Sequence, residues 1–129
     1  MYEDERGAPA GGMEGRAFVV RVPAEADHER APELEAALGG ALEQPAERTV
    51  VDLSGTDFAD STLLHVLLAA QRAHRGRGRP MVVAGPFGRS VHRLFEVTGT
   101  AGFFDLAETA GAATGPGGPR DPGPRRARP

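Results

Sequence analysis

The sequence has 129 residues, which is enough for one domain with a hydrophobic core of its own. Its formal net charge of -3 gives no general attraction to nucleic acid or to an anionic membrane. The absence of cysteine excludes disulfides, thiolate metal sites and cysteine nucleophiles.

The two ends of the sequence lack the periodicity of helices or strands. Residues 1–14 are acidic and glycine-rich, without the apolar segment of a signal peptide, and we expect a flexible tail there. Residues 112–129 are rich in glycine, proline and arginine, and we expect a second flexible tail that is either simply solvated or grips an acidic partner. No apolar run approaches the roughly 20 residues of a membrane span. We therefore expect a cytoplasmic protein with one folded domain over residues 15–111.

Between these tails, strand and helix patterns alternate. In chain order, they predict a strand at 17–22, a helix at 29–43, a strand at 50–53, a helix at 61–75, a strand at 81–84, a helix at 88–98 and a short strand at 103–106. Continuous apolar strands joined by helices are typical of a mostly parallel sheet with helical cover. The 61–75 helix is apolar over too wide a face for a surface helix, so we expect it to be largely buried, with Phe58 packed in the loop before it.

The residue pattern argues against metal binding and hydrolysis. The four histidines are scattered, and His65 and His74 lie nine residues apart on one predicted helix, too far to share a metal ion. Neither Ser61 nor Ser90 lies in the G-x-S-x-G motif of a serine hydrolase. A group of arginines at the end of the 61–75 helix forms either a solvated helix end or a docking patch for an acidic partner. These residues are Arg72, Arg75, Arg77 and Arg79.

The most informative segment is Asp60-Ser61-Thr62, where an apolar helix begins after an apolar strand. A helix N-terminus exposes unpaired N–H groups and carries a partial positive charge, so it tolerates a phosphate as a ligand or on a side chain. Asp60, Ser61 or both can cap this helix. From the residues alone, Ser61 is either a helix cap or a phosphorylation switch.

Four segments resemble those of a STAS domain, the fold of the bacterial anti-sigma factor antagonists. They are residues 24–27 before the first helix, 50–62 with the switch motif, 81–85 in the following strand and 91–99 in the next helix. The resemblance covers about residues 16–110. It implies a single α/β domain, with a small mixed but mostly parallel sheet and helices packed mainly on one face.

The resemblance also implies a regulatory role. In that family, the serine directly after the motif aspartate is phosphorylated, which by position is Ser61, with Thr62 as a neighbouring hydroxyl. The unphosphorylated antagonist binds an anti-sigma factor that is also a serine/threonine kinase, and the sigma factor is released. Phosphorylation by that kinase ends binding, and a phosphatase resets it. This chain is then a kinase substrate without catalysis or cofactor, because ATP and Mg²⁺ belong to the kinase, and it needs neither nucleic acid nor membrane.

The same resemblance assigns roles around Ser61. Asp60 caps the helix and orients the acceptor, while Asp27 and Asp57 shape the rim that the partner reads. Leu63 stands where the family usually has glycine, so it either obstructs the kinase or adds an apolar contact to the partner. The alternative is a STAS module that is not phosphorylated and acts as an adaptor or as a sensor of a small ligand.

Overall fold

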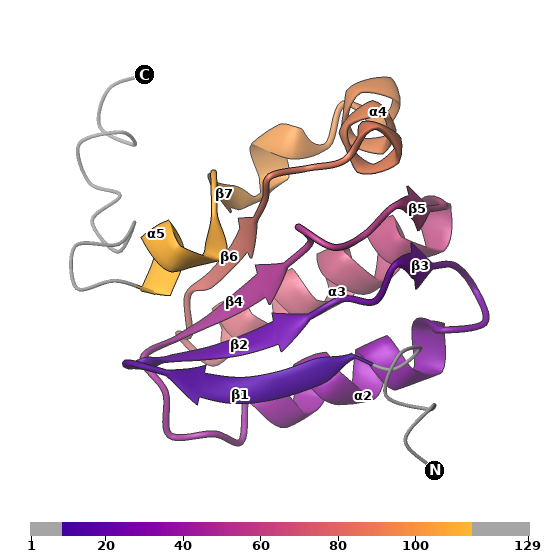
Figure 1. Ribbon diagram of the computed structural model, residues 1–129. Helices are drawn as coiled ribbons and strands as arrows, with labels where there is room; N and C mark the ends of the chain where they lie inside the picture. The colour runs from indigo at the N-terminus through magenta and orange to yellow at the C-terminus, as the bar shows by residue number, and fades with distance from the viewer. Residues whose placement is uncertain (1–8, 115–129) are drawn as a thin grey trace, which may run out of the picture.

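A five-stranded sheet forms the centre of the protein (Figure 1), and the computed structural model describes residues 9–114. In spatial order, its strands are β1 (Ala10–Glu14), β2 (Ala17–Arg21), β4 (Arg48–Asp52), β6 (Met81–Ala84) and β7 (Asp105–Ala107). The two short strands β3 (Glu25–Ala26) and β5 (Phe58–Ala59) pair with each other outside this sheet. The helical elements are α2 (Ala31–Ala41), α3 (Ser61–Gly76), α4 (Arg89–Thr98), the 3₁₀ helix η1 (Ala101–Phe103) and α5 (Ala110–Thr114).

The sheet is mixed but mostly parallel, as predicted. The four strands β2, β4, β6 and β7 run parallel to one another, and β1 at the edge is antiparallel to β2. Every residue of β4 and β6 is buried. Both strands are covered on both faces, which explains why they read as unbroken apolar runs rather than as an alternating pattern.

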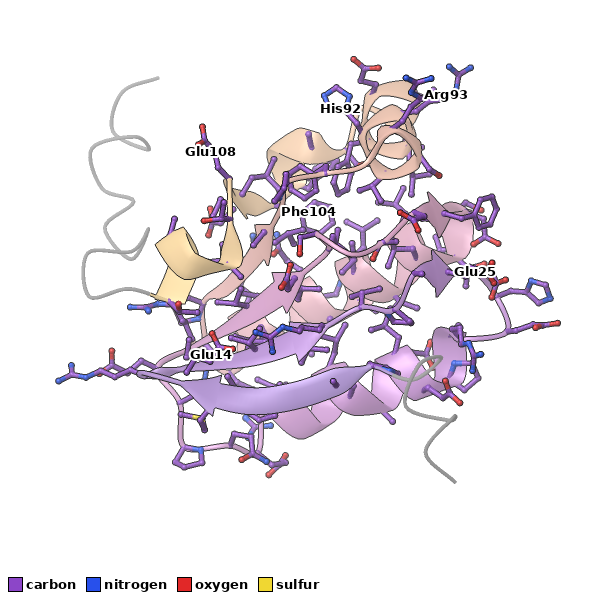
Figure 2. The ribbon with its side chains drawn as sticks, in the orientation of Figure 1. Glu14, Glu25, His92, Arg93, Phe104 and Glu108 are labelled. Carbon is purple, nitrogen blue, oxygen red and sulfur yellow. The ribbon has the colours of Figure 1, made fainter. Side chains whose placement is uncertain are left out.

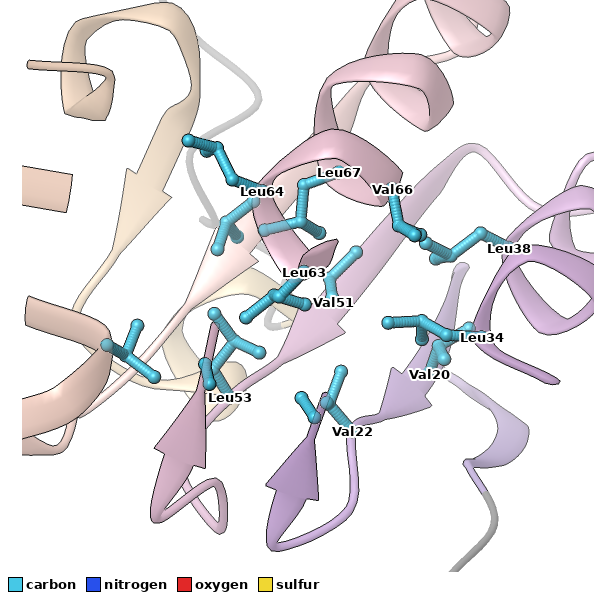
Figure 3. Packing of buried hydrophobic residues seen from close by; sticks show 14 of the residues in the cluster. Val20, Val22, Leu34, Leu38, Val51, Leu53, Leu63, Leu64, Val66 and Leu67 are labelled. Atoms are coloured by element: carbon cyan, nitrogen blue, oxygen red, sulfur yellow. The ribbon is translucent and has the colours of Figure 1, made fainter. Parts of the chain in front are cut away.

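The helices lie mainly on one face of the sheet, as predicted. Because side chains alternate between faces along a strand, Val51 and Val83 belong to a large core with α2, α3 and α4 (Figure 3). Their neighbours Val50 and Val82 belong to a smaller cluster with α5 on the other face. The predicted burial of the 61–75 helix is confirmed, since α3 contributes four apolar side chains to the large core. None of the helices among the described residues has the length and apolar character of a membrane span.

The expected domain boundaries were wrong at both ends. Residues 10–14, assigned to the N-terminal tail, form β1 and pair along their whole length with β2. The two glycines of this strand have low strand propensity, so the sequence did not predict it. A Cβ on Gly11 would lie 2.8 Å from the ring of Phe18, so the ring can pack here only because Gly11 has no side chain. Residues 112–114, assigned to the C-terminal tail, complete α5, where Ala113 is fully buried. Residues 1–8 and 115–129 of the expected tails lie outside the described residues.

Some element bounds also differ from the sequence prediction. The predicted helix at 29–43 forms only over Ala31–Ala41 as α2. The predicted strand at 103–106 begins later, because the chain first makes the turn of η1 and then forms β7 at Asp105–Ala107. The short strands β3 and β5 have two residues each, too few to show the alternating pattern of a strand, so the sequence did not predict them.

Candidate functional site

The α3 helix begins at the predicted segment, and the structure assigns its cap to Asp60. Asp60 has extended backbone geometry, and its Oδ1 accepts a hydrogen bond of 2.9 Å from the backbone N–H of Thr62. This is the standard geometry of an N-cap aspartate. Ser61 is the first residue of the helix and is exposed. Among the described residues, no hydrogen bond occupies the Ser61 hydroxyl, so the helix start does not depend on it.

Two loops meet beside this helix start and hold each other in place. The strands β3 and β5 pair in parallel, so Glu25 lies opposite Phe58. The N–H of Asp57 donates to the carbonyl of Ala24 at 2.8 Å, immediately before this pairing. The buried hydroxyl of Thr56 donates to the carbonyl of Pro23 at 3.1 Å. Loops far apart in the sequence therefore form one surface next to Ser61.

A third element, α4, also contributes to this surface through Ser90. The Oγ of Ser90 lies 3.2 Å from the N–H of Ala59, from which it accepts, and 3.4 Å from the carbonyl of the same residue. Ser90 is in the first turn of α4, while Ala59 ends β5, two residues before Ser61. From the sequence, Ser90 was a candidate only for a nucleophile, and this structural role was not predicted. No local signal reveals it, because the two residues are 31 positions apart.

The predicted aspartates lie on the two paired loops that precede α3. Asp27 and Asp60 directly follow the paired residues Ala26 and Ala59, Glu25 is paired with Phe58, and Asp57 directly precedes Phe58. We call these four acidic residues the acidic rim; Figure 2 shows Glu25 beside β3 and β5. Asp57 and Glu25 are exposed, whereas Asp27 is half-buried and accepts a hydrogen bond of 3.1 Å from the N–H of Glu29. Ser61 therefore directly follows a pair of loops that carry four carboxylates.

The expected role of Leu63 at the partner surface was wrong. Its side chain is only 2% exposed and packs in the large core near Val51 and Leu53 (Figure 3). The side chain at this position points beneath the helix, because residues two apart on a helix face different directions. Leu63 therefore neither blocks a partner at Ser61 nor contacts one. Thr62 is half-buried, so Ser61 is the more accessible of the two hydroxyls.

Phe58 lies on the surface of the site, although the sequence predicted that it packs within its loop. Its side chain is 50% exposed, directly beside the acidic rim. The two-residue strand β5 turns the next residue, Ala59, into the core and leaves Phe58 on the outer side. Since aromatic residues are enriched in protein interfaces, this ring is a candidate contact for a partner.

The described residues contain no group of three or more histidine, aspartate or glutamate side chains that could hold a metal ion. The residues gathered at this surface are one free hydroxyl, four carboxylates and one aromatic ring. In this arrangement the hydroxyl can accept a covalent modification, and the surrounding surface can bind another protein.

Comparisons with known proteins agree with this geometry. A family model described as "Mlab, STAS domain" matches residues 11–108. A solved structure of an anti-sigma factor antagonist from Mycobacterium paratuberculosis is 28% identical, with a TM-score of 0.70, over 79% of this chain and 86% of that one. No curated protein matches the sequence.

Two more distant structures share the fold. The anti-sigma-factor antagonist (STAS) domain protein of Planctomyces limnophilus is 18% identical, with a TM-score of 0.64, over 79% of this chain and 91% of that one. The Bacillus cell fate determinant SpoIIAA, solved in its phosphorylated form, is 17% identical with a TM-score of 0.61, over 94% of this chain and 100% of that one. At these identities the likeness concerns the fold alone.

Proposed function

Because this chain belongs to the STAS domain family, we propose that it is an anti-sigma factor antagonist switched off by phosphorylation of Ser61. The unmodified protein binds an anti-sigma factor that is also a serine/threonine kinase, and the sigma factor is thereby released. The kinase then phosphorylates Ser61 and binding ends, until a phosphatase removes the phosphate. The chain is a binding module and a kinase substrate, and the ATP and Mg²⁺ of the reaction are bound by the kinase.

The observation that carries this proposal is the exposed hydroxyl at the first position of α3. Since Asp60 accepts the capping hydrogen bond, Ser61 can be modified without loss of the helix cap. The burial of Leu63 leaves the approach to that hydroxyl clear of its side chain. The similarity to the mycobacterial antagonist, which extends over most of both chains, supports the same role.

Electrostatics explain how a phosphate can end binding. A phosphate on Ser61 adds about -1.5 to -2 charges at neutral pH. The partial positive charge of the helix start tolerates this locally. A partner packed against the site would then cover a phosphate together with the acidic rim, and burying like charges next to one another is costly. A loss of only about 2.7 kcal/mol weakens binding roughly a hundredfold.

This switch requires no change of fold. The helix cap, the pairing of β3 with β5 and the contact between Ser90 and Ala59 are all independent of the Ser61 hydroxyl. The modification therefore acts at the surface that the partner contacts. The folded domain serves as a rigid support for it.

The modification is tested by incubation with ATP and a cognate anti-sigma kinase, followed by measurement of the intact mass. We expect one phosphate on the wild type and on a Ser54→Ala control, which removes another exposed serine from the neighbouring loop. We expect none on Ser61→Ala. Labelling of Ser61→Ala at the wild-type level would reject the site.

The repulsion mechanism is tested separately by measuring partner affinity. We expect Ser61→Asp to bind the unmodified anti-sigma factor at least tenfold more weakly than wild type, whereas Ser54→Asp adds the same charge farther along the loop and binds nearly normally. Undiminished binding by Ser61→Asp would reject repulsion. A chain that is never phosphorylated yet binds its partner would instead be the non-switching adaptor.

A further inference from the structure

A second site lies at the opposite end of the sheet, where a cavity of about 570 Å³ opens. Its lining includes residues at the beginnings of β4, β6 and β7, together with the last turns of α3. Ser61 lies beyond the other ends of the parallel strands, at the beginning of α3 (Figure 1). The length of α3 therefore separates the cavity from the candidate phosphorylation site.

The cavity is positively charged. Among the described residues, its lining contains Arg48, Arg75 and Arg79 but only one carboxylate, that of Asp105. No ion pair among the described residues involves any of the three arginines, although the neighbouring Arg77 is paired with a glutamate. Three arginines against one aspartate thus leave an excess of positive charge in this lining.

Arg48 is the most informative of these residues because it is buried. Its exposed fraction is 5%, and its Nη1 donates one hydrogen bond of 3.2 Å to the carbonyl of Ala113. A guanidinium has five N–H donors, and burying its charge without a counter-charge is unfavourable. An anion in the cavity that Arg48 lines would provide that counter-charge.

The other two arginines differ in mobility. Arg79 is held in place, since its Nη1 donates to the carbonyl of Ala41 at 3.0 Å and its Nη2 donates to the carbonyl of Gln44 at 2.7 Å. Arg75 is exposed on the last turn of α3. Arg79 therefore adds positive charge near the cavity while its guanidinium is bonded at the end of α2, and Arg75 is the exposed side chain that can adjust to a ligand. Both features suit the binding of a charged group by planar guanidinium donors.

The remaining wall of the cavity is largely apolar. Pro80, Met81 and Val82 line it from the beginning of β6, and Phe103 and Phe104 line it from η1 and the segment that follows. Phe103 is 62% exposed, so its ring is accessible to a ligand. A ligand with an apolar group next to its negative charge would match both parts of the lining.

We propose that this cavity binds a small organic anion, in which a phosphate or carboxylate contacts the arginines and an apolar group packs against Phe103 and Met81. This proposal does not depend on the function of Ser61. The distance between the two sites along α3 allows both to be occupied at once.

Nuclear magnetic resonance titration of the full chain tests the proposal. The probes are phenyl phosphate and benzoate at constant ionic strength, with benzyl alcohol as the uncharged analogue. We expect saturable shifts of the cavity amides of Gly78, Val82 and Gly102 with at least one anion, and comparison of the two separates phosphate from carboxylate recognition. No saturable shift with either anion, or equally tight binding of benzyl alcohol, would overturn the proposal.

Two matched variants test the role of the arginines. Arg75→Gln removes an exposed cavity arginine, and Arg72→Gln removes the same charge from an exposed position on α3 that does not line the cavity. We expect Arg75→Gln to weaken anion binding roughly tenfold, the effect of losing a charge-assisted hydrogen bond. Arg72→Gln should change it little. Equal weakening by both variants would show a non-specific charge effect and overturn the proposal.

Discussion

The hydroxyl of Ser90 is hydrogen-bonded to the backbone of Ala59, which ties the first turn of α4 to the short strand that precedes the candidate phosphorylation site. Among residues 9–114, no other side-chain hydrogen bond joins α4 to the loop that leads into α3, and this contact involves both the N–H and the carbonyl of Ala59. The position of Ser61 therefore depends on an element that follows it by almost thirty residues in the sequence.

Replacement of Ser90 by alanine should loosen this loop. We expect Ser90→Ala to lower the free energy of unfolding by about 1 kcal/mol, since one partly buried hydrogen-bonding side chain is lost. The amide of Ala59 should exchange with solvent faster than in wild type. Urea denaturation and hydrogen exchange measure these effects, with Ser54→Ala as an exposed control. Unchanged exchange at Ala59 would contradict the role of Ser90.

The burial of Leu63 leads to a stability prediction. We expect Leu63→Ala to lower the free energy of unfolding by about 2–5 kcal/mol, because it leaves a cavity in the core. Leu68→Ala, at a half-buried position on the same helix, should cost clearly less. Denaturation curves of the two variants provide the measurement. A loss from Leu63→Ala no larger than that from Leu68→Ala would contradict the core position.

The exposed ring of Phe58 leads to a binding prediction that rests on the proposed function. We expect Phe58→Ala to weaken binding to the anti-sigma factor about tenfold or more, since aromatic residues often dominate protein interfaces. Its effect on stability should be small because half of the ring is exposed. Calorimetric titration measures the affinity, and Val97→Ala, at an exposed apolar position on α4, is the control. Wild-type affinity of Phe58→Ala would exclude the ring from the interface.

The buried imidazole of His74 predicts a pH dependence of stability. Burial lowers the pKa of His74 from its ordinary value of 6.5, an effect that the charges of Arg79 and Arg77 reinforce and a hydrogen bond to the carbonyl of Ala70 opposes. Its Nε2 lies 2.9 Å from Oγ1 of Thr49. Because the unfolded chain binds the proton more readily, the contribution to stability is complete above pH 6.5 and declines as the pH falls toward the lower pKa of the folded state.

Denaturation at a series of pH values tests this expectation. The free energy of unfolding should decrease below pH 6.5 in wild type and in His65→Gln, which changes an exposed histidine of the same helix. In His74→Gln this part of the pH dependence should be reduced, whatever the stability of that variant at neutral pH. An unchanged slope in His74→Gln would contradict the assignment.

The strands and helices that could be predicted are those whose own residues carry the signal. The continuous apolar residues of β4 and β6 indicated central parallel strands, because both of their faces are covered. The helix start at Asp60 could be predicted because a capping aspartate acts on an N–H only two residues away. The resemblance to STAS domains also rested on short local segments. The family match over residues 11–108 confirms that resemblance.

The features that could not be predicted depend on residues far away in the chain. The glycines of β1 form a strand because β2 supplies their hydrogen-bonding partners and Phe18 fills the space beside Gly11. The two-residue strand β5 exists because β3 pairs with it. In both cases the local propensity is weak, and pairing with another segment decides the structure.

By itself, the sequence determined the class of fold, the main helices and strands, and the hydroxyl at the beginning of α3, since these follow from periodicity and from contacts between close neighbours. Only the tertiary structure decided that Leu63 is buried while Phe58 is exposed, that the two loops of the acidic rim pair with each other, and that three arginines line one cavity. The reason is that exposure and clustering depend on which distant segments cover or adjoin a residue, and a short stretch of sequence carries no record of them.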